Sequence, residues 1–145
     1  MDVDLLAVAD RELDPQMWAP LRDDATRVDV RRGDADDPFR AVIRVDRPAE
    51  LPVDILVGRF PWQRAVIERA KTVEIGTASV PVVGAADLIL LKLFAGGTQD
   101  LWDVRRLLDA AVSRDAVVRE VDLRIEALPR DCHEHWDRLR RGDPG

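Results

Sequence analysis

The sequence is poor in the features that mark several large classes of protein. It has a single cysteine, Cys132, which excludes an internal disulfide and fits a reducing compartment. The longest run of large apolar residues, Leu88–Leu91, is followed by Lys92 and is far too short to cross a membrane. The N-terminus lacks the basic, apolar and small-residue blocks of a signal peptide. We therefore expect a cytoplasmic protein with no membrane partner.

The chain also has fewer basic than acidic residues. The 145 residues include 28 acidic and 22 basic side chains, a net charge of -6, which argues against an extended surface for duplex nucleic acid but leaves room for a local basic groove. With 46% hydrophobic residues and no internal repeat, the chain is long enough to bury a substantial core. We therefore expect one domain over residues 1–145.

The order of apolar and turn-forming segments predicts an α/β (α+β) fold with a mixed β-sheet flanked by helices. Short apolar strands are expected at residues 2–8, 26–30, 39–46 and 53–57, and a hairpin at 72–83. Helices are expected at residues 15–24, 61–70, 85–94, 99–111, 115–127 and 132–140. We expect the first strand to be buried and the fourth to be central. The sheet-rich core would then cover residues 1–83 and the helical C-terminal part residues 84–145.

Two carboxylates stand one residue apart in the first strand, and a third interrupts the fourth. Asp2 and Asp4 leave the same face of a strand, where two carboxylates repel and raise each other's pKa unless a cation lies between them. Asp54 stands in an otherwise apolar pentad, where an unpartnered charge is costly to bury. Three such oxygen donors favour Mg²⁺ or Mn²⁺ and phosphoryl chemistry. In the alternative interpretation, all three aspartates lie at solvent-exposed ends of their strands and bind no metal.

Lys92 interrupts a second apolar segment, so its aliphatic stem must cross apolar surface. The pattern leaves two roles open for its ammonium group, an ion pair with Asp100 or Asp103 and a contact with a substrate phosphate. A position in the first turn of a helix is enough to explain Asp100. The run Cys132–His135 does not predict a zinc site, because the sequence has no second cluster of ligands.

Residues 80–104 resemble a signature of the nucleotidyltransferase superfamily, most closely its bacterial AbiEii-like branch, which includes toxins of toxin–antitoxin systems. In that branch a polar turn leads to a helix with Lys-Leu-x-Ala and then to a helix with Asp-x-x-Asp. The matching segments here are Lys92–Ala95 and Asp100–Asp103. Upstream, Asp2–Asp4 resembles the Asp-x-Asp strand of the superfamily, and Asp54 resembles its third carboxylate.

The resemblance implies transfer of a nucleoside monophosphate from a nucleoside triphosphate to an acceptor hydroxyl or phosphate. Asp2 and Asp4 would hold Mg²⁺ or Mn²⁺, and Asp54 would complete the catalytic site and help to deprotonate the acceptor. Lys92 would face the triphosphate, with Asp103 beside it in the substrate site. The acceptor stays open between tRNA, a protein and a small molecule. An antitoxin and a second copy of this chain are the candidate protein partners.

One element of the superfamily pattern is missing from the printed sequence. The pattern has Gly-Ser at a helix N-terminus, a natural phosphate cradle, some way before the Asp-x-Asp, whereas here Asp2 follows Met1 directly. We therefore expect weaker anchoring of a triphosphate. A second hypothesis follows, in which the chain is a non-catalytic, truncated or degenerate module of this fold that acts in protein interaction or self-association.

Overall fold

The computed structural model describes residues 3–8, 13–35 and 37–142. By its internal contacts the chain divides into two compact units, Met1–Arg64 and Ala65–Gly145. The predicted α+β class is confirmed, with a mixed β-sheet, helices and a helical C-terminal part. The expectation of one domain over residues 1–145 stays a prediction.

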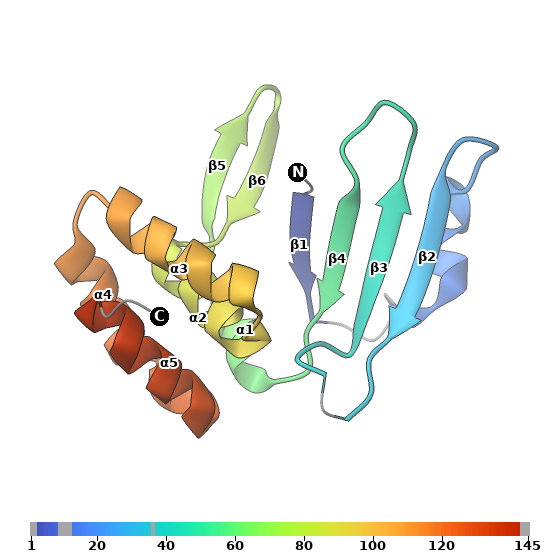
Figure 1. Cartoon of the computed structure of the whole chain (residues 1–145). Helices are drawn as coiled ribbons and strands as arrows, with labels where there is room; N and C mark the ends of the chain where they lie inside the picture. The colour runs from blue at the N-terminus through green and yellow to red at the C-terminus, as the bar shows by residue number, and fades with distance from the viewer. Residues whose placement is uncertain (1–2, 9–12, 36, 143–145) are drawn as a thin grey trace. The chain divides into compact units, whose positions relative to one another are not determined.

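The first unit is built on a four-stranded sheet in the order β1–β4–β3–β2 (Figure 1). Its strands are β1 (Val3–Ala7), β2 (Arg27–Arg32), β3 (Ala41–Asp46) and β4 (Val53–Val57). β1 runs parallel to β4, whereas β3 runs antiparallel to both β4 and β2. The sheet is therefore mixed, and β4 has the interior position predicted from its apolar sequence.

One face of this sheet carries the hydrophobic core of the first unit. Side chains alternate along a strand, so Ile43 and Ile55, which are register partners, point to the same face. They belong to a buried cluster with Trp18, which is contributed by the 3-10 helix η2 (Pro15–Leu21). Asp14 caps this helix by accepting a hydrogen bond from the Gln16 amide at 2.9 Å. The opposite face carries Asp54 and Arg44 together with the apolar side chains of Leu6, Val42 and Leu56.

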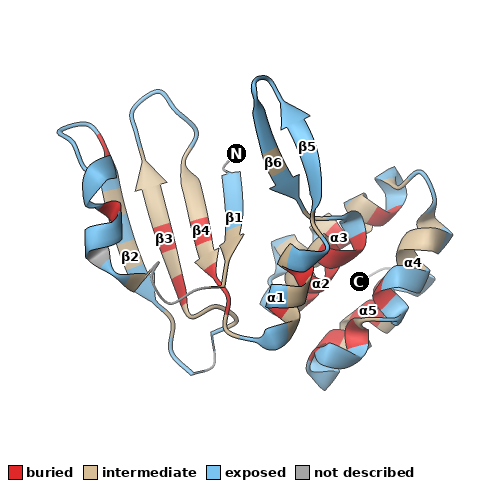
Figure 2. Cartoon of the chain, turned by 180° about the vertical axis from the view of Figure 1, so that it is seen from behind, coloured by how far each residue is buried: buried red, intermediate tan, exposed pale blue. Residues whose placement is uncertain are grey.

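The prediction that the first strand is buried is wrong, because β1 lies at the edge of the sheet. Val3 and Leu5 are 42% and 49% exposed, and Figure 2 shows the first half of the strand as exposed. An apolar composition predicted burial on both sides. An edge strand, however, has one neighbour instead of two and leaves part of its side chains in water.

The second unit consists of a hairpin and a group of helices (Figure 1). The hairpin strands are β5 (Lys71–Ile75) and β6 (Ala78–Val82). The helices are α2 (Ala85–Ala95), α3 (Thr98–Ala110), α4 (Arg114–Asp122), the 3-10 helix η3 (Ile125–Ala127) and α5 (Arg130–Arg141). Helix α1 (Pro61–Glu68) spans the boundary between the units. The helix predicted over residues 115–127 is thus divided into α4 and η3.

Helix α2 is the centre of the helical core and contacts α3, α4 and α5. Its residues Ile89, Leu90 and Leu93 are at most 1% exposed. Trp136 of α5 is also buried, and its indole N–H donates a hydrogen bond to Asp122 at 2.7 Å. In the described part of the chain, the helices are too short or too polar to span a membrane.

Candidate functional site

Asp4 and Asp54 lie side by side on the sheet of the first unit. They are register partners on the neighbouring parallel strands β1 and β4, so their side chains leave the same face. Neighbouring strands are about 4.8 Å apart. The register therefore brings together two of the three predicted metal ligands. The third, Asp2, lies outside the described residues.

The charged residues continue as a row across the sheet. Arg44 of β3 is the register partner of Asp54, and Asp29 of β2 is the register partner of Arg44. From the β1 edge inward, the row reads Asp4, Asp54, Arg44 and Asp29. It lies on the face opposite the buried Ile43, since adjacent residues of a strand point to opposite faces. We call these four residues the charged row.

Arg44 holds Asp54 in an ion pair that sequence reasoning missed. Its Nη1 donates to the two oxygens of Asp54 at 3.0 and 3.3 Å, and its Nε donates to Asp46 at 3.1 Å. The Asp54 side chain is 17% exposed, and an ionised carboxylate at that depth needs a counter-charge. Residues 39–46 carry Arg44 among apolar residues, but only the strand register identifies its partner.

The donor chemistry of the pair Asp4 and Asp54 fits Mg²⁺ or Mn²⁺. Both metals prefer oxygen ligands, and Mg²⁺ is usually held by one or two protein carboxylates, with water and substrate phosphate completing the shell. Among the described residues, no group of three Asp, Glu, His or Cys side chains is placed to hold a metal ion. A metal bound by the described residues would therefore depend on these two carboxylates and on ligands from water or substrate.

Lys92 and Asp103 meet in the second unit as an ion pair. The Nζ atom of Lys92 lies 2.8 Å from Oδ2 of Asp103 and 3.3 Å from Oδ1 of Asp100. The pair forms because a tight turn brings the end of α2 next to the start of α3. Gln99 donates a hydrogen bond to the other oxygen of Asp103 at 3.3 Å. Of the two roles left open for Lys92, the ion pair is observed, and the phosphate contact stays a prediction.

This ion pair keeps both of its members charged. Partial burial opposes the charge of Lys92, but hydrogen bonds with Asp103 and Asp100 outweigh it and raise the pKa of the ammonium group. The hydrogen bond from Lys92 in turn lowers the pKa of Asp103. Lys92 is therefore a fixed cation at neutral pH and is unsuited to accept a proton.

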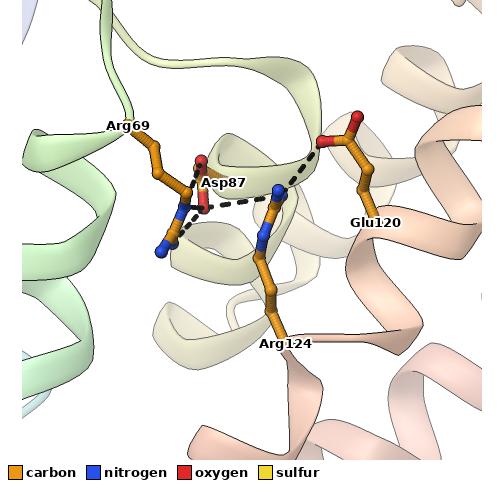
Figure 3. Close-up of polar contacts among 4 residues, drawn as sticks. All are labelled: Arg69, Asp87, Glu120 and Arg124. Carbon is orange, nitrogen blue, oxygen red and sulfur yellow. Dashed lines mark hydrogen bonds and ion pairs between the residues drawn. The ribbon is translucent and has the colours of Figure 1, made fainter.

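A second ion network holds the second unit together (Figure 3). Asp87, in the first turn of α2, has a side chain that is only 5% exposed. Arg69 donates to both of its oxygens, with the shortest contact at 2.6 Å, and Arg124 approaches it at 3.9 Å. Arg124 also pairs with Glu120 at 3.0 Å. The network joins α2, α4 and the segment before β5, and its charges are matched within the protein, which identifies it as structural.

A comparison with models of known protein families finds no match to this chain, and a comparison with curated protein sequences finds no significant match. The resemblance to nucleotidyltransferases therefore stands on the order and spacing of the motifs.

Proposed function

We propose that the chain is of nucleotidyltransferase type and binds Mg²⁺ or Mn²⁺ at Asp4 and Asp54. It would transfer a nucleoside monophosphate from a nucleoside triphosphate to an acceptor. The observation that carries the proposal is the register pairing of these two carboxylates on one face of parallel strands. Adjacent like charges destabilise a sheet, and a divalent cation bound between the two carboxylates would offset this repulsion.

Each residue would have a distinct task in this reaction. Asp4 and Asp54, with Asp2, would hold the metal, and Asp54 would help to take the proton from the acceptor. The bound metal would neutralise phosphate charge and orient the triphosphate. By the resemblance, Lys92 would face the substrate phosphates; it belongs to the second unit, where Asp103 holds its ammonium group. The acceptor class stays open between tRNA, a protein and a small molecule.

A second function is favoured by the edge position of β1. In the described sheet β1 pairs with β4 alone, and Val3 and Leu5 are exposed on it. Such an edge can accept a strand from another protein, an antitoxin for example, or from a second copy of the chain. In this non-catalytic module, the ion pair of Arg44 with Asp54 would be purely structural.

Metal-dependent thermal stability tests the proposal. We expect Mg²⁺ or Mn²⁺ to raise the melting temperature, because a ligand at about 100 times its Kd stabilises the folded state by about 2.7 kcal/mol. Asp4→Asn and Asp54→Asn should abolish this rise. The matched control is Asp109→Asn, which removes an exposed carboxylate of α3 and should leave the rise unchanged.

An unchanged melting temperature of the wild-type chain at millimolar metal would contradict the metal site. The interaction module would then be tested by light scattering after size-exclusion chromatography, where Leu5→Lys should abolish any dimer formed through β1. If metal does bind, incubation with labelled nucleoside triphosphates and candidate acceptors identifies the reaction.

A further inference from the structure

We propose that Arg44 is a built-in competitor of the metal: it neutralises Asp54 when no metal is bound and moves onto Asp46 when a divalent cation takes its place. Arg44 would then be a positioning residue that sets the metal affinity of the site. This inference rests on the proposed metal site at Asp4 and Asp54.

The contacts of Arg44 come from separate nitrogens, which makes such a transfer possible. Nη1 donates to both oxygens of Asp54, at 3.0 and 3.3 Å, whereas Nε donates to Asp46 at 3.1 Å. The guanidinium group can therefore release Asp54 by rotation while its Nε stays with Asp46. A metal would coordinate the same Asp54 oxygens at about 2.1 Å and would bring its positive charge next to the guanidinium group, so the two cations compete for Asp54.

The exposure of the three side chains favours the exchange. Asp54 is 17% exposed, whereas Arg44 and Asp46 are 43% and 46% exposed. The deeper Asp54 needs a cation at all times, but Arg44 can leave it without becoming a buried, unpaired charge. Water and Asp46 would still stabilise its guanidinium group.

The charged row gives a second reason to expect that Arg44 leaves Asp54 when a metal binds. Arg44 is flanked in register by Asp54 on one side and by Asp29 on the other. A divalent ion at Asp4 and Asp54 would repel the nearby guanidinium group, and Asp29 lies on the side away from the metal. The row therefore provides one further acceptor, Asp29, in addition to Asp46 for a displaced arginine.

Direct Mn²⁺ binding to the full chain tests the inference, measured as the loss of the free-Mn²⁺ signal in electron paramagnetic resonance. We expect Arg44→Gln to bind Mn²⁺ about fivefold more tightly than the wild type, the gain expected from removing a partly screened charge pair. The matched control is Arg31→Gln, an exposed position on the same sheet face that changes the net charge equally. It should change the affinity less than about twofold.

Two further variants separate competition from a loss of structure. Arg44→Lys keeps the charge but not the forked hydrogen bonds, and we expect an affinity between those of the wild type and Arg44→Gln. Asp54→Asn in the Arg44→Gln background should remove the gain. Circular dichroism spectra of the metal-free proteins would verify that each variant is folded.

The outcomes distinguish the inference from the function on which it rests. Tighter binding by Arg44→Gln than by the wild type supports the competition. Equal or weaker binding than the wild type overturns the competition and leaves the metal site intact. Absence of binding in every variant overturns the metal site itself, and the inference with it.

Discussion

Two acids of this protein, the partly buried Asp54 and the buried Asp87, stand in apolar stretches of sequence and are each matched by an arginine from another element. Asp54 is paired with Arg44, and Asp87 with Arg69. An acid in an apolar run thus indicates that a cation must be nearby, because leaving the charge unpaired is costly. The same pattern does not say whether that cation is a metal or a guanidinium group.

The pair of Asp87 and Arg69 should contribute strongly to stability. We expect Asp87→Ala to lower the free energy of unfolding by about 2 to 3 kcal/mol. This is below the range for fully buried pairs, since Arg69 is 36% exposed and can gain some hydration. Urea denaturation followed by circular dichroism measures the loss.

The control for this experiment is Glu120→Gln in the same network. Glu120 is 56% exposed, so its pair with Arg124 is screened by water, and we expect a change within about 0.5 kcal/mol. Equal losses in both variants would show that the burial of Asp87 does not determine the strength of the network.

Asp23 should make stability depend on pH in the acid range. Hydrogen bonds from the Ala25 amide, from the side chain and amide of Thr26, and from Arg47 lower the pKa of Asp23 from 3.8 to about 2. A carboxyl whose pKa is lowered by folding stabilises the native state above its ordinary pKa. That contribution is fully present above about pH 4 and is lost as the pH falls through about 2.

Urea midpoints measured between pH 2 and about 5 test this expectation. The Asp23→Asn variant should show a weaker dependence on pH across this window than the wild type. The control is Asp24→Asn, which changes the exposed residue next to Asp23. Its urea midpoints should depend on pH as those of the wild type do. Identical curves for all three proteins would mean that these hydrogen bonds are absent in solution.

At the scale of elements, the turn between α2 and α3 positions Lys92 against its two acids. Gly96 ends α2 in the left-handed conformation, with φ of 69°, and its amide donates to the Lys92 carbonyl. The next residue, Gly97, begins α3 in an extended conformation. The turn therefore depends on a residue that adopts positive φ without strain.

Substitutions at Gly96 should follow this conformational requirement. We expect Gly96→Ala to destabilise the protein by about 1 kcal/mol, because a β-carbon is strained at positive φ. Gly96→Asn should cost less, since asparagine tolerates this conformation. Thermal denaturation of the two variants compares them directly, and an equal cost for both would refute the conformational explanation.

At the scale of the whole molecule, each of the two units has buried residues of its own. In the first unit Ile43 and Val57 are fully buried in the sheet core, and in the second Ile89 and Leu108 lie in the helical core. Separate cores allow regions of one chain to open with different free energies. We therefore expect the stability of the two units to respond separately to core substitutions.

Ile43→Ala tests this expectation by creating a cavity in the first unit. It should cost about 2 to 4 kcal/mol in that unit. Hydrogen exchange should then lose protection in β3 and β4, with a much smaller change in α2. Leu108→Ala is the reciprocal variant and should reduce the protection of α2. Equal losses in both units after either substitution would show that they unfold as one.

The sequence by itself determined the class of the protein and the location of its elements. The strand predicted at residues 53–57 is β4 with the same bounds, and the helix predicted at 85–94 is α2. These predictions succeed because apolar periodicity, turn residues and helix ends act over a few neighbouring residues. The ion pair of Lys92 with Asp103 was among the options open from sequence for the same reason, since its residues belong to consecutive helices.

Only the tertiary structure decided the strand order, the edge position of β1 and the charged row. The pairing of Asp4 with Asp54, and of Asp54 with Arg44, depends on the register between strands that are distant in the chain. A slip of one residue would turn each of these side chains to the opposite face. Local sequence patterns set which residues alternate along a strand, but contacts between strands set which residues meet across the sheet.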